Sequence, residues 1–200
     1  MKHIFGKQSG LVLAAVAAFA ALGIGTAQAA PTFTTADITV NSVGFLDCAF
    51  KETGLTPGAS VDYTCGATDV GWVTQCFVKN KPVSNLPTAL HVAHAADGLV
   101  TTQDRTASRQ GVVTSAILTA YPTAEAEPVD PLCPETEGVT ITEEVTAIRW
   151  CNASLADVTN NVPGATTSEL FLQLKRNGSS NIPDCATLST LPSDLLGTPQ

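Results

Sequence analysis

Six cysteines are the residues that most constrain the chemistry of this 200-residue chain. They are Cys48, Cys65, Cys76, Cys133, Cys151 and Cys185. None of them belongs to a C-x-x-C motif, which argues against both a thioredoxin-type redox site and the usual zinc knuckle. An even number of cysteines is typical of disulfide pairing in an oxidising compartment. We therefore expect three disulfide bonds rather than a catalytic thiol.

The spacing favours two alternative partners for Cys65. A turn is expected at residues 53–58, where glycine and proline suit a chain reversal, and it would place Cys48 opposite Cys65. The next turn, near residue 70, would place Cys76 opposite Cys65 instead. Only one of these bonds can form, and a direct bridge between neighbouring strands also needs a suitable pairing type.

Two histidines and a run of acids are the candidate metal ligands. His91 and His94 would share one face of a helix, but on a strand, which the sequence favours, the two rings point to opposite sides. The region between Arg109 and Arg149 has no basic residue, and its carboxylates would suit calcium: Glu125, Glu127, Asp130, Glu135, Glu137, Glu143 and Glu144. It lacks an EF-hand pattern and is rich in proline, so we interpret it as a solvated connector without a metal.

Catalytic motifs give no positive signal. The chain contains no G-x-S-x-G, S-x-x-K or H-E-x-x-H sequence. Carboxylates for glycoside hydrolysis would be paired in space rather than in sequence, so a hydrolase stays the third hypothesis. Tyr63, Trp72, Tyr121 and Trp150 could stack on a sugar ring, although aromatic residues on strands more often fill a core. We expect no catalytic residue and no cofactor.

The overall charge separates further classes. The chain has 10 Lys and Arg against 18 Asp and Glu, a net charge of −8, which argues against binding of nucleic acid. Its 44% hydrophobic and 14% charged residues indicate a folded rather than a disordered chain.

Residues 1–29 are interpreted as a secretory signal peptide. Lys2 and Lys7 precede an unbroken apolar run at residues 11–24, and Ala27 and Ala29 supply the small residues of a cleavage site. The run is shorter than the ~18–20 residues that span a bilayer. We therefore expect a secreted or periplasmic protein with no membrane contact after cleavage.

The elements that must position these residues are strands. Alternation of apolar with polar residues, and the abundance of valine and threonine, predict short strands over the following segments: 37–41, 46–50, 61–67, 72–78, 88–95, 112–121, 139–142 and 145–155. A turn is expected at residues 68–71. Residues 168–176 fit a strand better than a helix, and no confident helix is present. The expected fold is all-β: an antiparallel sandwich of about eight strands spanning residues 30–178. Residues 179–200 are expected to form an irregular tail tethered by Cys185.

Several short motifs carry a family resemblance. The segments 48–55 (CAFKETGL), 63–65 (YTC), 75–76 (QC), 132–134 (LCP) and 155–160 (LADVTN) occur in this order. Over residues 45–160 the chain resembles a group of small secreted bacterial β-sandwich proteins of unestablished function. The resemblance implies an Ig-like sandwich and a Cys76–Cys133 bond that pins the proline-rich loop to the sheet. It implies no catalytic residue and no ligand.

Two functional hypotheses follow besides the hydrolase. The first is an exported, disulfide-stabilised binding or structural protein, more often monomeric than polymeric, with an unidentified protein or glycan as partner. The second is a subunit of a surface appendage assembled by strand donation, in which residues 33–41 would complete a neighbour's sheet. The C-terminal residues 195–200 lack the alternating strand that such a subunit would need.

Overall fold

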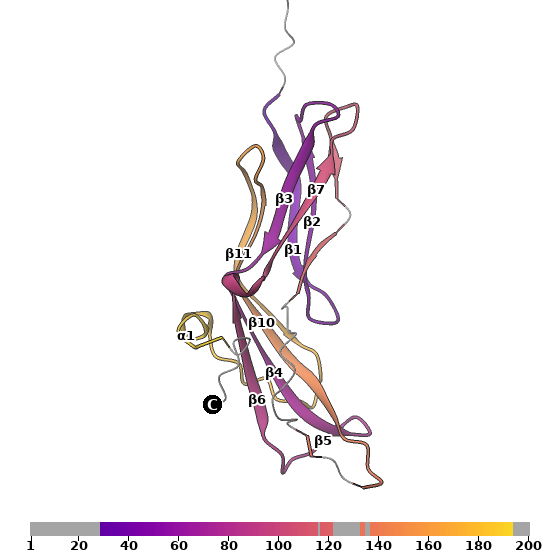
Figure 1. Ribbon diagram of the computed structural model, residues 1–200, viewed down its shortest axis with the longest axis vertical. Coiled ribbons are helices and arrows are strands. Elements are labelled where there is room, and N and C mark those ends of the chain that lie inside the picture. The colour runs from indigo at the N-terminus through magenta and orange to yellow at the C-terminus, as the bar shows by residue number, and fades with distance from the viewer. Residues whose placement is uncertain (1–28, 116, 122–132, 135–136, 194–200) are drawn as a thin grey trace, which may run out of the picture.

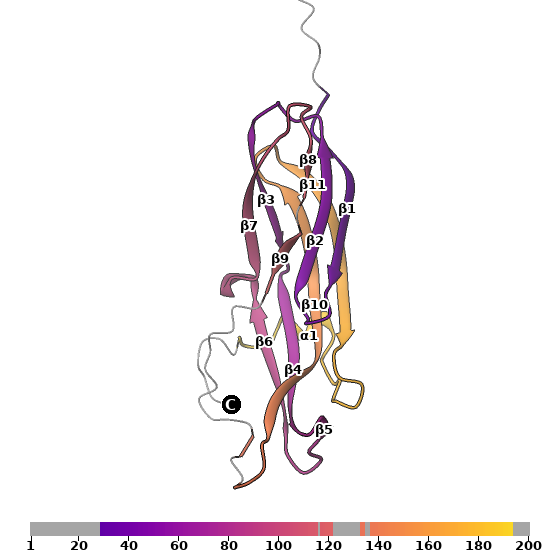
Figure 2. The same cartoon turned by 90° about the vertical axis from the view of Figure 1, so that its right-hand side faces the viewer.

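A computed structural model describes residues 29–115, 117–121, 133–134 and 137–193 of the chain. These residues form two antiparallel sheets, and helix is limited to a one-turn α-helix and a short 3₁₀ helix. The molecule is long and narrow, with its strands running close to the long axis (Figures 1 and 2). The expected disulfide-stabilised all-β sandwich is confirmed. The predicted signal peptide lies outside the described residues, apart from Ala29 at its end.

The smaller sheet is built around β2 (Leu46–Thr53). It pairs on one side with β1 (Thr32–Val40) and on the other with β8 (Val113–Thr114) and β9 (Leu118–Ala120). The single strand expected at residues 112–121 is therefore divided. The reason is that the Ser115 hydroxyl accepts the Phe50 N–H at 2.9 Å, so a side chain takes the place of a backbone carbonyl in the ladder.

The larger sheet is built around β10 (Thr142–Asp157). It pairs on one edge with β11 (Val162–Gln173) and on the other with β3 (Ser60–Gly66) and β4 (Asp69–Val78). The sequence pattern divides this long strand in two and is wrong there, because polar Glu143 and Glu144 interrupt the apolar alternation that marks a strand. The strand expected within residues 168–176 is confirmed as part of β11, which ends at Gln173.

β3 and β4 are almost one continuous strand. Tyr63 opposes Asp157 and Asp69 opposes Cys151, which is the same register on both sides of residues 67–68. Thr68 between them donates its N–H to the Cys151 carbonyl at 3.1 Å. The turn expected at residues 68–71 is therefore wrong. Gly71 is needed for packing rather than for a turn, since a Cβ there would lie 2.7 Å from Leu188 Cδ2.

A second pair of strands lies end to end alongside β3 and β4 in the same way. β6 (Thr88–His94) pairs with β4, and β7 (Val100–Thr106) pairs with β3. The 3₁₀ helix η1 (Ala95–Asp97) joins them, and β5 (Lys81–Pro82) closes a tight turn after β4. β7 was not expected from the sequence because it is an edge strand in which exposed residues alternate with half-buried polar ones. The unexpected β5 and β7, the presence of β11 and the division of 112–121 outweigh the merging of two expected strands in β10, so the described residues form eleven strand segments instead of about eight.

Two apolar cores stabilise the molecule. The larger lies between the two sheets and contains the fully buried Tyr63 and Trp150. The smaller lies between the larger sheet and residues 179–193, which we call the C-terminal arm. The arm carries the one-turn helix α1 (Cys185–Leu188), which lies beside β4, β6 and β10 (Figure 1). Leu188 and Ile182 of the arm pack on Val73, Val92 and Ala147 of the sheet.

Gly71→Ala is expected to loosen the arm. The added methyl would meet the fully buried Leu188 and also Ile182, so we expect a loss of about 1–2 kcal/mol in the free energy of unfolding. Urea unfolding measures this loss. In a Leu188→Ala background the penalty for the same change should shrink, and an equal penalty in both backgrounds would contradict the contact.

Candidate functional site

All six cysteines are paired, as predicted. The bonds are Cys48–Cys65, Cys76–Cys133 and Cys151–Cys185, with Cα–Cα distances of 6.0, 5.5 and 5.6 Å. These distances lie in the ordinary range for disulfides. The Cys76–Cys133 bond is the one that the family resemblance implies.

The Cys48–Cys65 bond resolves the two alternatives, but with a different geometry from a bridge between neighbouring strands. β2 belongs to the smaller sheet and β3 to the larger one, so the chain crosses from one sheet to the other at residues 54–59. The bond therefore joins two facing sheets through the core, where both cysteines are fully buried. The sequence located the turn correctly but could not show that the turn changes sheets.

His91 and His94 lie on opposite faces of β6, as the strand pattern predicts. His91 stacks on Trp72 with ring centroids 5.3 Å apart, and its Nε2 lies 3.0 Å from the Thr74 hydroxyl. His94 faces Asp69 on the other side of the sheet. The described residues include no group of three or more His, Cys, Asp or Glu side chains that could hold a metal ion.

His94 fastens the C-terminal arm to the larger sheet. Its Nδ1 lies 2.6 Å from Asp69 Oδ1 at the start of β4, and its Nε2 lies 2.8 Å from the Leu191 carbonyl oxygen in the arm. Both partners are acceptors, so both ring nitrogens carry a proton when the two bonds form together. The ring is then an imidazolium, and its contact with Asp69 is an ion pair.

The surroundings of His94 support the charged form. Burial lowers the pKa of His94, but the hydrogen bonds to Asp69 and to the Leu191 carbonyl, with the charges of Asp69 and Asp97, outweigh burial and raise that pKa above its ordinary value. Thr68 donates its hydroxyl to the second oxygen of Asp69 at 2.6 Å. This bond fixes the carboxylate that faces the ring.

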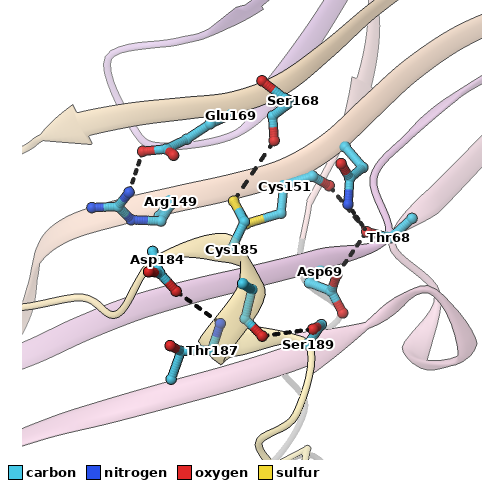
Figure 3. The surroundings of a disulfide bond; sticks show 12 residues. Thr68, Asp69, Arg149, Cys151, Ser168, Glu169, Asp184, Cys185, Thr187 and Ser189 are labelled. Atoms are coloured by element: carbon cyan, nitrogen blue, oxygen red, sulfur yellow. Dashed lines mark hydrogen bonds and ion pairs between the residues drawn. A yellow bond between two sulfur atoms is a disulfide. The ribbon is translucent and has the colours of Figure 1, made fainter.

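A disulfide holds the same arm a short distance along the chain. Cys185, at the start of α1, is bonded to Cys151 of β10 (Figure 3). Asp184 caps the helix by accepting the Thr187 N–H at 2.8 Å. Beside this bond, Arg149 of β10 and Glu169 of β11 form an ion pair (Figure 3). The arm is thus attached by a covalent bond, the hydrogen bond between His94 and the Leu191 carbonyl oxygen, and apolar packing.

His94→Ala is expected to destabilise the protein more in acid than in base. A raised folded-state pKa gives a contribution that is present below the unfolded value of about 6.5 and disappears as the pH rises through the folded value. We expect a loss of about 1–2 kcal/mol at pH 6 and a smaller loss at pH 9, where the neutral ring keeps only one of its two donors. Urea unfolding of both proteins at each pH measures it. An equal loss at both values would contradict an imidazolium bond.

A second cluster of titratable groups is buried between the two sheets. Glu52 of β2 and Asp157 of β10 are both fully buried, and Tyr63 donates its hydroxyl to Glu52 Oε2 at 2.6 Å. The pKa of Glu52 is raised to about 7, mainly by burial; the hydrogen bond from Tyr63 opposes this increase, and the neighbouring Asp157 adds to it. Asp157 accepts two hydrogen bonds from Asn160, at 2.9 and 2.7 Å.

The protonated form of Glu52 satisfies this cluster. Oε1 is buried without a hydrogen-bond partner when Glu52 is ionised, whereas a proton lets Glu52 donate to Asp157. Proton sharing of this kind is also how catalytic carboxyl pairs work, but these carboxyls are enclosed in the core. Sequence reasoning missed them, although Glu52 continues the inward positions 46, 48 and 50 of β2, and a carboxyl in that series is a detectable signal.

The predicted aromatic candidates fall into two groups. Tyr63, Trp72 and Trp150 are buried and belong to the larger core, as is usual for aromatic residues on strands. Tyr121 is 52% exposed and lies against the ring of Phe45, with centroids 5.8 Å apart.

Most of the candidate calcium ligands lie outside the described residues: Glu125, Glu127, Asp130 and Glu135. Of the others, Glu144 forms an ion pair with Lys175, and hydrogen bonding by Lys175 lowers the pKa of Glu144. Glu137 and Glu143 are exposed. In the described part of the chain these acids therefore form no cluster.

The end of the sandwich remote from the arm carries a polar hollow of about 530 Å³. Its wall includes Lys51 of β2, Arg105 of β7 and residues of the loop between β7 and β8. The side chains of both basic residues are free of ion pairs with any described residue. Neither residue was singled out from the sequence, because β7 was not recognised as a strand and the two are 54 positions apart.

The chain matches no protein-family model, no curated protein and no solved structure. The expected kinship with small secreted bacterial proteins therefore stays a prediction. Function has to be inferred from the geometry alone.

Proposed function

We propose that the protein works outside the cytoplasm as an Ig-like β-sandwich module that acts by binding or structural contact rather than by catalysis. The observation that carries the proposal is the placement of the three disulfides. One joins the two sheets, one anchors Cys133 to the far end of β4, and one holds the C-terminal arm. Such bonds persist in oxidising compartments and are rare in the cytosol.

The arrangement of the titratable residues is consistent with this role. The pair formed by Glu52 and Asp157 lies in the core, and His94 forms an ion pair with Asp69 of the sheet and a hydrogen bond that fastens the arm. Both groups therefore govern how the stability of the fold depends on pH. No helix in the described part of the chain is long and apolar enough to span a bilayer.

The strand-donation alternative ranks second. β1, the strand that would be donated, pairs with β2 of its own chain from Thr32↔Thr53 to Val40↔Leu46. Donation would require β1 to leave this pairing and expose the apolar face of β2. A self-contained module needs no such rearrangement. A secreted hydrolase remains the weakest hypothesis.

Cell fractionation with non-reducing electrophoresis tests the proposal. We expect a discrete monomer in the periplasm or medium that begins at Ala30, and peptide mapping should recover the three bonds. A cytoplasmic protein with reduced cysteines would overturn the proposal. A ladder that disappears when residues 30–41 are deleted, while the shortened protein still folds, would establish strand donation instead.

A further inference from the structure

We propose that the polar hollow between Lys51 and Arg105 binds the acidic group of a carbohydrate. This inference names a ligand class for the binding role proposed above and therefore rests on it. The hollow lies where the two sheets meet at an open edge, with Lys51 on β2 of the smaller sheet and Arg105 on β7 of the larger one. Its volume, about 530 Å³, is within the range of small-ligand sites.

The charge of the hollow is opposite to that of the protein. Among the Lys and Arg residues that the structure describes, only Arg149 and Lys175 have an acidic partner, Glu169 and Glu144 respectively. Of the unpaired ones, Lys51 and Arg105 are the two that line the hollow. Lys51 and Arg105 form no ion pair within the described residues, so their charges remain available to an anion.

Arg105 is held in place and still has an unused donor. Its Nη2 donates to Gln103 Oε1 at 2.5 Å, which fixes the guanidinium. Its Nε is buried and lacks a hydrogen-bond partner among the described residues. A buried donor without a partner is costly, and a guanidinium can bind an oxyanion through two parallel N–H groups. Nε itself has no contact with solvent, so an oxyanion in the hollow would bind through the remaining Nη protons of Arg105.

The rim of the hollow is preorganised by the loop after β7. Ser108 Oγ accepts the N–H groups of Gln110 and Val112, each at 3.2 Å. The Gly111 carbonyl oxygen accepts the Leu55 N–H at 3.1 Å, and the Gly111 φ of +67° is one that favours glycine. A rim that is already ordered loses little conformational entropy when a ligand binds.

The neutral groups around the two cations favour a sugar over a simple ion. The wall contributes the hydroxyls of Thr106, Ser108 and Thr114 and the amide of Gln110. The Ser108 hydroxyl keeps its own proton for donation, because the loop uses its oxygen only as an acceptor. Hydroxyls and an amide suit the hydroxyls of a sugar ring, while Lys51 and Arg105 suit a carboxylate or sulfate on that ring.

Isothermal titration calorimetry of the purified full-length exported protein tests this site. The probes are a glucuronate-containing oligosaccharide, a sulfated oligosaccharide, a neutral oligosaccharide of equal length and inorganic sulfate. We expect at least one acidic oligosaccharide to bind and the neutral one not to bind. The two acidic probes distinguish carboxylate from sulfate as the recognised group. Binding of inorganic sulfate alone, of the neutral sugar equally well, or of no probe would overturn the proposal.

Matched variants locate the binding. Lys51→Gln should weaken affinity at least tenfold, and the fold should be unaffected because the Lys51 side chain is exposed. Arg105→Lys keeps the charge but loses the paired N–H groups, so it should also weaken binding. Lys81→Gln removes one positive charge at the opposite end of the molecule (Figure 2) and should leave affinity unchanged. Equal losses in Lys51→Gln and Lys81→Gln would show diffuse attraction and overturn the site.

Cell fractionation tests the proposed function, and calorimetry tests this site independently. An extracytoplasmic monomer that binds no probe would therefore contradict this site alone.

Discussion

Replacing Trp150 with alanine is expected to lower the free energy of unfolding by about 4 kcal/mol, the largest effect of any single change considered for this protein. Trp150 is fully buried at the centre of β10. Its Nε1 donates to the Gly44 carbonyl oxygen at 2.9 Å, so it also fixes the turn between β1 and β2 against the larger sheet. Alanine would leave a cavity and an unpaired carbonyl. Urea unfolding followed by circular dichroism measures the loss.

Trp150→Phe separates the two contributions. Phenylalanine keeps most of the apolar volume but cannot donate to Gly44, so we expect a loss of about 1–3 kcal/mol from the unpaired carbonyl and the smaller ring. Phe171, 43% exposed on β11, is a control, and Phe171→Ala should cost less than either change. A Trp150→Ala variant as stable as the parent would contradict the assigned position of Trp150 in the core.

The second large effect concerns the pH dependence of stability. Glu52 has a folded-state pKa of about 7 against an ordinary value of 4.5, so between these values the folded protein holds a proton that the unfolded chain has lost. Stability contributed by this group is therefore complete below pH 4.5 and falls as the pH rises toward 7. A difference of this size corresponds to about 3 kcal/mol.

Glu52→Gln should remove this dependence. A glutamine amide can accept from Tyr63 and donate toward Asp157, as protonated Glu52 does, but it never ionises. We expect the variant to match the parent at pH 4.5 and to exceed its free energy of unfolding by about 3 kcal/mol at pH 8. Denaturant unfolding at both values gives the difference. Glu137→Gln, on an exposed residue, should leave the profile of the parent unchanged. Parallel profiles for the parent and Glu52→Gln would show that Glu52 is ionised throughout.

The local pattern of the sequence predicted much of the fold because that pattern reflects one buried face. Leu46, Cys48 and Phe50 alternate with polar residues, and all three are buried on the inner face of β2. The predicted turn at residues 53–58 and the strand placement of the two histidines were correct for the same reason. Local propensity failed at Gly71, where glycine indicated a turn although the actual constraint is the Leu188 side chain, which is more than 100 positions away.

The candidate sites depended on contacts that sequence cannot display. His94 meets the Leu191 carbonyl across 97 positions, and Arg105 reaches the hollow beside Lys51 only because β7 and β2 belong to facing sheets. A side chain's partners are set by which strands become neighbours, and many strand orders satisfy the same apolar alternation. Glu52 is intermediate between these cases. Its inward position could be read from β2, but its buried neighbour Asp157 could not.

By itself the sequence determined the all-β class, the oxidation of the cysteines and the faces on which His91 and His94 lie, since each depends on residue type and short-range periodicity. Only the tertiary structure decided that the Cys48–Cys65 bond joins two sheets, that β3 and β4 form one line along β10, and that His94 fastens the arm. These features arise from packing between segments far apart in the chain. That packing is selected by the burial of the whole apolar surface, which no local segment encodes.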